Sequence, residues 1–119
     1  MLTEVPNCRQ IKGEPERRWF SCETMDLIVW YSSGSIIAFQ LCYDKMSYEH
    51  ALTWREESGF SHNKVDTGEM YGFLSDRLTP ILISDGSVRW ERIQLLFSEA
   101  SGTMDSTVAE FVMLKLSQA

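Results

Sequence analysis

The sequence predicts an α+β fold, an antiparallel β-meander of about four to five strands with two C-terminal helices packed on one face. Two observations support this prediction. Short runs of apolar and β-branched residues, separated by turn residues, fill the first part of the chain, and two stretches with helical spacing follow them. At 119 residues, without repeats or a Pro/Gly/Ser-rich linker, the chain 1–119 is expected to form a single domain.

The strands are predicted from alternation and turn composition. Gly13, Glu14 and Pro15 interrupt the chain early, and residues 32–35 have the Ser/Gly composition of a hairpin turn. Residues 56–69 lack a clear period and are expected to form a long loop, with at most a brief strand near Phe60. The expected strands are 5–12, a short segment at 17–20, then 25–31, 36–43, 48–55 and a short one at 81–84, with 70–74 left open between helix and strand.

Alternation in 36–43 predicts which face of the sheet the helices cover. The bulkier set, expected to face the helices, is Ile37, Phe39, Leu41 and Tyr43. On the other face, Ile28, Trp30 and Ile36 would form an exposed apolar patch if the helices cover one face only. A homodimer would hide this patch. The alternative is that the 5–12 segment or the long loop folds across it.

The two helices are predicted from apolar spacing and caps. Ser87 can cap the first, and Gly102 ends it. Asp105 or Ser106 can cap the second, and Lys115 suits its C-terminal end. The expected apolar stripes are Ile93, Leu96, Phe97 and Ala100 in the first helix, and Val108, Phe111, Val112, Met113 and Leu116 in the second.

Charge and composition exclude several classes of partner. Seventeen acidic against eleven basic residues give a net charge of −6, which disfavours nucleic acid and anionic membranes. No run approaches the roughly 18 apolar residues of a membrane span, and the N-terminus lacks the pattern of a signal peptide. The three widely spaced cysteines, Cys8, Cys22 and Cys42, fit free thiols in a reducing compartment. We therefore expect a cytoplasmic protein without contact to nucleic acid or membrane.

Motifs with a strong chemical meaning are missing from the sequence. It contains no phosphate-binding glycine loop, no CxxC, no HExxH and no GxSxG. Two histidines, His50 and His62, do not suggest a metal site by their spacing, so neither metal nor cofactor is expected. Cys22 and Cys42 have no base beside them in the sequence and are interpreted as structural.

One local concentration of functional side chains suggests a pocket near the 54–66 loop. Its candidate ligand-binding residues are Tyr43, Lys45, Trp54, Arg55, His62 and Asp66. Aromatic walls with a cation and an imidazole are typical of a small-ligand site, and His62 with Asp66 could act as base and orienting group. The alternative interpretation places the aromatic residues in the core, the cations in solvent and His62 in a turn.

Four segments of the chain resemble a family of small uncharacterised bacterial proteins. They are Arg18-Trp19-Phe20, residues 25–30, residues 39–45 and Ala51-Leu52-Thr53-Trp54-Arg55. The likeness covers roughly residues 17–70. It implies a bacterial cytoplasmic protein with a strand meander. Because the family has no established activity, it assigns no catalytic residue.

Two functions follow as hypotheses. The first is a non-enzymatic binding or interaction protein whose partner is a second copy of the chain or another protein. The second is a small-ligand-binding protein or enzyme with its site around residues 54–66.

Overall fold

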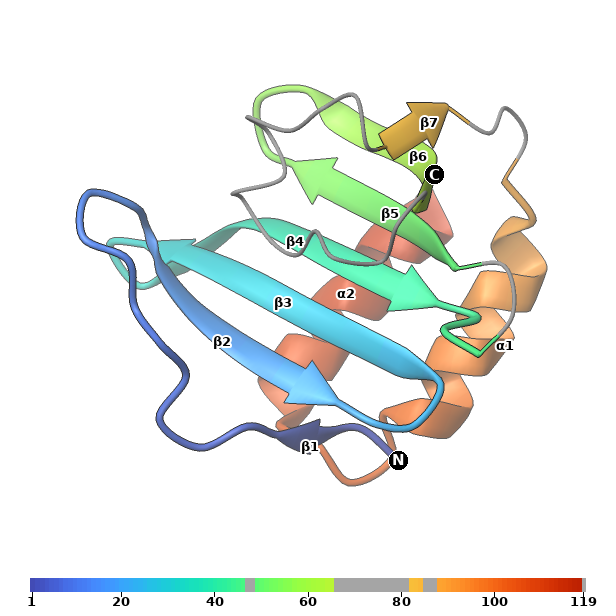
Figure 1. The fold of residues 1–119 in the computed structure, drawn as a ribbon, viewed down its shortest axis with the longest axis horizontal. Helices are drawn as coiled ribbons and strands as arrows, with labels where there is room; N and C mark the ends of the chain where they lie inside the picture. Colours follow the sequence, from blue (N-terminus) through green and yellow to red (C-terminus); the bar gives the residue numbers. More distant parts are fainter. Residues whose placement is uncertain (47–48, 66–81, 85–87, 119) are drawn as a thin grey trace.

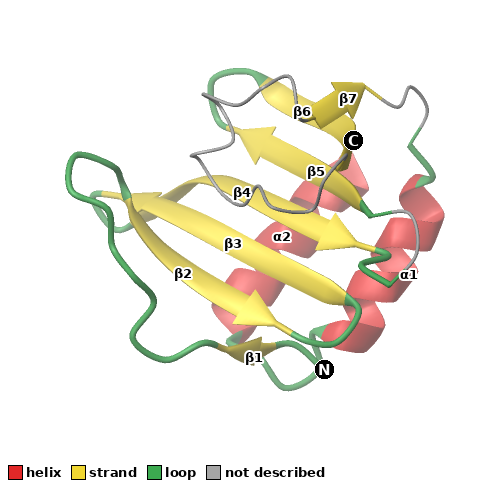
Figure 2. Cartoon of the chain, viewed as in Figure 1, coloured by secondary structure: helices red, strands yellow, loops and turns green. Residues whose placement is uncertain are grey.

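The computed structural model describes residues 1–46, 49–65, 82–84 and 88–118. Within them a seven-stranded sheet runs in chain order with every neighbouring pair antiparallel, and both helices lie on one face (Figures 1 and 2). The predicted α+β meander with C-terminal helices is confirmed, with more strands than expected. The elements are β1 (Thr3–Glu4), β2 (Glu16–Ser21), β3 (Met25–Ser32), β4 (Ser35–Tyr43), β5 (His50–Arg55), β6 (Gly59–Val65), β7 (Leu82–Ser84), α1 (Trp90–Ala100) and α2 (Ser106–Gln118).

The predicted strand over 5–12 is wrong. Thr3 and Glu4 pair with β2, the Val5 amide still donates to the Trp19 carbonyl at 2.8 Å, and the chain then leaves the ladder. Pro6 has no amide hydrogen to donate, and Asn7 takes a left-handed backbone conformation with φ 55°. Further along, the Gln10 carboxamide accepts from the Arg17 amide at 2.9 Å and donates to the Arg17 carbonyl at 2.8 Å. A side chain thus replaces the backbone partner that a strand would supply.

A β-bulge in β4 reverses part of the predicted face assignment. The register shifts so that Trp30 pairs with Ala38 and Tyr31 with Ile36, which leaves Ile37 as the extra residue. Ile36 therefore joins the core under the helices, while Ile37 packs with the cluster on the opposite face. The prediction that grouped Ile36 with Ile28 and Trp30 is wrong, because strict alternation does not hold across a bulge.

The long loop predicted for 56–69 is replaced in part by a strand. β6 pairs with β5 along its length, from Arg55 opposite Gly59 to His50 opposite Lys64. Gly59 has φ 81°, which allows the tight turn after Arg55. The period of two in β6 escapes a search for apolar alternation because most of the strand is polar. The short strand predicted at 81–84 is observed as β7, whereas 70–74 and Ser87 lie outside the described residues.

The core lies between the sheet and the two helices. Ile93 and Phe97 of α1 and Val108, Val112 and Leu116 of α2 are buried at helical spacing, as predicted. The predicted cap Asp105 is confirmed, since its Oδ1 accepts the Thr107 amide at 2.8 Å. The strands contribute mainly Phe20, Met25, Leu27, Val29, Ile36, Phe39, Leu41, Tyr43, Leu52 and Trp54 to this core.

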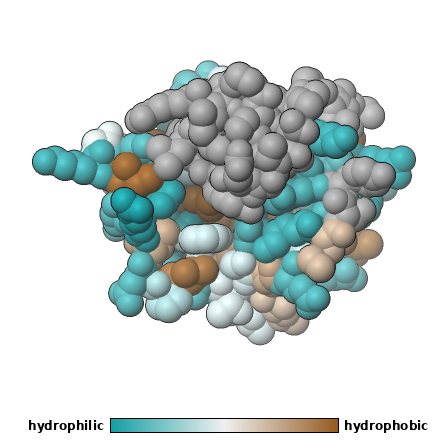
Figure 3. Space-filling view, viewed as in Figure 1, coloured by the Kyte–Doolittle hydropathy of each residue, from teal (hydrophilic) through white to brown (hydrophobic). Residues whose placement is uncertain are grey.

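The opposite face of the sheet has a second, smaller apolar cluster of Ile28, Trp30 and Ala38. Ile28 is 3% exposed and Trp30 1% exposed in the single chain. Figure 3 looks onto this side of the molecule, where the described side chains are mostly hydrophilic with hydrophobic ones scattered between them. The buried polar residues on this face of the sheet are Asp26, Gln40 and Thr53.

Candidate functional site

Because neighbouring strands are antiparallel, the residues predicted to form one pocket lie at different ends of the sheet. Tyr43 ends β4 and pairs with His50 at the start of β5, whereas Trp54 lies near the other end of β5. Trp54 faces the helices, and its neighbour Arg55 follows on the opposite side of the strand. Among the described members of the predicted set, the structure brings Tyr43 and His62 into contact. Asp66 lies outside the described residues.

Tyr43 and His62 form an aromatic group with His50 on the helix side of the sheet. The Tyr43 hydroxyl and His62 Nε2 share a hydrogen bond of 2.5 Å. The His50 and His62 rings are parallel, with centroids 5.1 Å apart and an interplanar angle of 4°. The sequence did not indicate that His50 lies beside His62. It predicted a loop at His62, whereas the contact between the two rings depends on the pairing of β5 with β6. Among the described residues no group of three ligating side chains that could hold a metal ion is present.

Lys45 lies on the face opposite the helices, where it neutralises a buried carboxylate. Its Nζ donates to Asp26 Oδ1 at 3.1 Å and to the Cys22 carbonyl at 2.9 Å. The Ser21 hydroxyl donates to the same Asp26 oxygen at 2.5 Å. Because the Asp26 side chain is only 6% exposed, this pairing offsets the cost of burying its charge. Lys45 therefore has a structural partner and is remote from Trp54.

Cys42 belongs to the same polar region and has no reactive character. Burial raises the pKa of its thiol strongly, and the nearby charges of Glu49 and Asp26 raise it further. The thiol therefore stays protonated at neutral pH, and the thiolate is the nucleophilic form. Burial likewise raises the pKa of Glu49.

A cleft of about 610 Å³ opens on the helix side, between the β3–β4 hairpin, the end of β5 and the first turns of α2. Of the described members of the predicted pocket, Trp54 alone lines it. The described lining residues are Tyr31, Gly34, Ser35, Ile36, Trp54, Glu56, Thr107, Phe111 and Lys115.

Aromatic rings fix a cation in the wall of this cleft. Trp54 stacks on Phe39 with centroids 5.7 Å apart and meets Phe111 edge-on at 5.4 Å. The Lys115 ammonium lies 5.0 Å from the Trp54 centroid and 5.4 Å from that of Phe111, within the range of cation–π attraction. The sequence shows Phe111 and Lys115 at i and i+4 on one helix face, but it does not reveal their meeting with Trp54.

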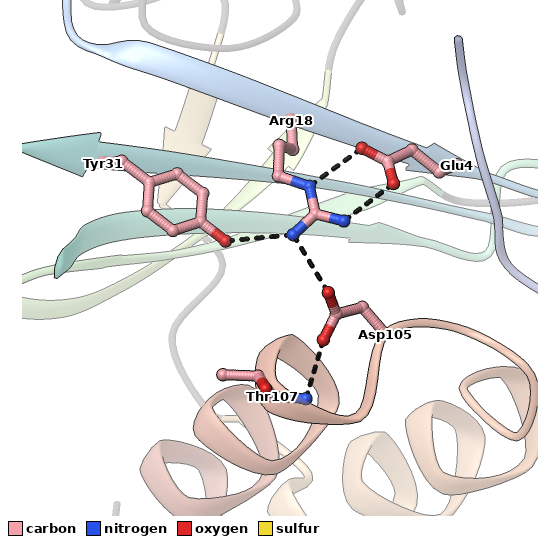
Figure 4. A network of polar contacts seen from close by, with 5 residues as sticks. All are labelled: Glu4, Arg18, Tyr31, Asp105 and Thr107. Atoms are coloured by element: carbon pink, nitrogen blue, oxygen red, sulfur yellow. Dashed lines mark hydrogen bonds and ion pairs between the residues drawn. The ribbon is translucent and has the colours of Figure 1, made fainter. Parts of the chain in front are cut away.

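An arginine network supports one side of the cleft (Figure 4). The Arg18 guanidinium donates twice to the Glu4 carboxylate, at 2.8 and 2.7 Å, and once to the Tyr31 hydroxyl at 3.4 Å. It also reaches Asp105 Oδ2 at 3.3 Å, and the other Asp105 oxygen accepts the Thr107 amide at 2.8 Å. Arg18 thereby connects Tyr31 of β3 with the start of α2, and Tyr31 and Thr107 both line the cleft.

The ionisation of this network follows from its hydrogen bonds. The bonds from Arg18 lower the pKa of Glu4, and the bonds to Glu4 raise the pKa of Arg18. The pKa of Asp105 is lowered mainly by the Thr107 amide and then by Arg18. All three groups are therefore charged at neutral pH. The sequence offered no signal for this network, because Arg18 and Asp105 are 87 residues apart.

Comparison with known proteins gives no relative for this chain, because no family model, curated protein or solved structure matches it. In the part of the chain that the structure describes, no helix is long and apolar enough to cross a membrane. The site must therefore be interpreted from its own geometry.

Proposed function

We propose that this protein is a non-enzymatic binding protein that holds a small organic molecule in the cleft between the β3–β4 hairpin and α2. The size of the cleft, about 610 Å³, lies within the roughly 300–1,000 Å³ usual for small-molecule sites. Its composition also fits such a site, because Ile36, Trp54 and Phe111 supply apolar surface beside a small number of polar groups.

The observation that carries this proposal is the position of Lys115. Its ammonium rests on Trp54 and Phe111 in the wall of the cleft, and within the described parts of the chain it has no carboxylate within 4.0 Å. An ammonium group that aromatic rings hold and that has no counter-ion among the described residues can pair with a negatively charged group of a ligand. The alternative is that the lysine stem merely covers aromatic surface, as long cationic side chains do elsewhere.

Binding is favoured over catalysis by the chemistry of the lining. The described lining residues include neither histidine nor cysteine, so within them no imidazole stands beside the Ser35 and Thr107 hydroxyls to activate either as a nucleophile. The Tyr43–His62 pair that could supply a base does not belong to that lining.

The burial of Ile28, Trp30 and Ile36, which are 3%, 1% and 9% exposed in the single chain, supports a ligand site over an interface built on these three residues. A homodimer stays a prediction, which a solution mass from light scattering tests.

The cellular setting is part of the same proposal. Cys8, Cys22 and Cys42 are all free thiols, which supports a reducing compartment such as the bacterial cytoplasm that the sequence resemblance implies.

The proposed function is tested by thermal stabilisation with a library of small charged amphipathic compounds. A ligand that binds only the folded state raises its stability by RT ln(1 + [L]/Kd), about 2.7 kcal/mol at a hundredfold excess over Kd. Thr107→Trp should fill the mouth of the cleft from an exposed position and abolish the shift. Leu114→Trp, at an exposed position of the same helix outside the cleft lining, is the matched control and should keep it.

Two results would contradict the proposal. One is a library in which no compound stabilises the wild-type protein. The other is a shift that Thr107→Trp retains in full, because the ligand would then bind elsewhere.

A further inference from the structure

We propose that the ligand of this cleft is a zwitterion, an apolar molecule carrying both a carboxylate and an ammonium group, as amino acids and short peptides do. Lys115 would bind the carboxylate and Glu56 the ammonium. This inference rests on the proposed function and specifies the chemical class of the ligand.

Glu56 follows the last residue of β5 and lies in the turn 56–58 that leads into β6. Its amide donates to the Ile37 carbonyl at 2.9 Å, which ties the start of this turn to β4. Glu56 is exposed and belongs to the residues that line the cleft, together with Trp54 and Lys115.

The cleft holds opposite charges that do not neutralise each other. The ion pairs between described residues join Arg18 to Glu4 and Asp105, Lys45 to Asp26, and Arg92 to Asp44. Neither Glu56 nor Lys115 takes part in them. The turn after β5 thus supplies an anion and α2 supplies a cation, whose ammonium lies 5.0 Å from the Trp54 ring centroid.

A zwitterion satisfies this wall better than a ligand with a single charge. A simple anion would pair with Lys115 but would face Glu56 and the net charge of −6. A simple cation would pair with Glu56 but would face the Lys115 ammonium. Like charges brought together disfavour the wrong partner, so the two residues act as a filter for a molecule with both signs.

The apolar part of the ligand has a defined place. Trp54 stacks on Phe39, the Lys115 ammonium lies over its ring, and the residue is 9% exposed, so most of its ring surface is covered. Half-buried Phe111 and Tyr31, with Ile36 between the hairpin and the helix, provide the remaining apolar wall. A ring or branched alkyl group fits this surface.

Matched probes of one carbon skeleton test the inference by isothermal titration calorimetry. L-phenylalanine and the dipeptide phenylalanyl-phenylalanine carry both charges, whereas 3-phenylpropionate lacks the ammonium and 2-phenylethylamine lacks the carboxylate. We expect at least one zwitterion to bind tenfold or more tightly than both singly charged probes. The tighter of the two zwitterions identifies a free amino acid or a peptide as the source of the charges.

Variants that remove one charge show which residue binds the carboxylate and which binds the ammonium of the ligand. Lys115→Met should weaken the binding of the zwitterion and of 3-phenylpropionate, and Lys115→Arg should restore both affinities. Glu56→Gln should weaken the zwitterion and 2-phenylethylamine. Glu57→Gln and Lys12→Met, exposed charges that do not line the cleft, are the controls and should leave the affinity unchanged.

The inference and the proposed function fail in different ways. If 3-phenylpropionate binds as tightly as the zwitterions and Glu56→Gln leaves its affinity unchanged, the inference of a zwitterionic ligand is overturned. The cleft would still be a ligand site. The same holds if all four probes fail but a singly charged library compound stabilises the protein and Thr107→Trp abolishes its effect. If no probe and no library compound binds, both proposals are overturned.

Discussion

Arg18 connects the strand layer to the start of α2, and its replacement by methionine tests that connection. Arg18→Met keeps a long apolar stem over the Phe20 ring, which lies 5.1 Å from the guanidinium carbon, but removes the two hydrogen bonds to Glu4. The side chains of Arg18 and Glu4 are 30% and 43% exposed, so solvent screens their attraction. A pair of this kind contributes roughly 0.5–1 kcal/mol to the free energy of unfolding.

A double-mutant cycle isolates this contribution. The coupling between Arg18→Met and Glu4→Gln, measured by urea unfolding followed by tryptophan fluorescence, should be about 0.5–1 kcal/mol at low salt. It should fall towards zero in 1 M salt, where the Debye length is about 3 Å. Arg17→Met is the control, because the Arg17 side chain donates to the Arg9 carbonyl and should show no coupling with Glu4→Gln.

The pH dependence of the same cycle has a fixed sign. The pKa of Glu4 is lowered from 4.5 in the folded protein, so its contribution is complete above the unfolded pKa and is lost as pH falls through the folded pKa. The coupling should therefore be present at pH 7, decrease once the pH falls below 4.5, and be lost when the pH lies below the folded pKa of Glu4. No coupling at low salt, or a coupling that persists in strong acid, would refute the role given to Arg18.

Three further predictions concern the rest of the molecule. Ile36→Ala should lower the free energy of unfolding by about 2–4 kcal/mol and Ile37→Ala by about 1 kcal/mol, because the bulge puts only Ile36 in the main core; equal losses in urea unfolding would contradict the bulge. Glu49→Gln should raise the free energy of unfolding by about 0.5 kcal/mol at pH 7, because the folded pKa of Glu49 is raised above 4.5 and its ionisation costs free energy in the folded protein. The gain should fade towards pH 4, and no gain in a thermal melt at pH 7 would contradict this. Ellman titration should detect three thiols after denaturation but not Cys42 in the native protein, and rapid native reaction of all three would contradict its burial.

The sheet could be predicted from sequence where apolar alternation and turn residues agree. The β3–β4 hairpin is the clearest case, because Ser33 and Gly34 both take positive φ values, 53° and 81°, in the turn that the Ser/Gly composition had indicated. The same reasoning failed at Ile36, since a bulge changes the face of a side chain without changing the composition. It also failed at β6, whose residues pair through their backbone while their side chains are mainly polar.

The candidate site was harder to predict because it depends on long-range packing. Trp54 was identified from its local neighbours, but Tyr43 was placed with it on the assumption that the ends of adjacent strands meet. In an antiparallel pair the end of one strand meets the start of the next, so Tyr43 meets His50 instead. Lys115 and Glu56 carried no local mark of function, and only the packing of α2 on the sheet brings them to one cleft.

The most direct test of the cleft as a ligand site is a two-dimensional ¹H–¹⁵N NMR titration with the compound that stabilises the protein most. The proposal predicts saturable shifts at the backbone amides of Ser35, Glu56, Thr107 and Lys115, with little change at Asp26 and Cys42 on the opposite face. Shifts confined to the opposite face or to the Tyr43–His62 pair, with the cleft amides unmoved, would contradict it.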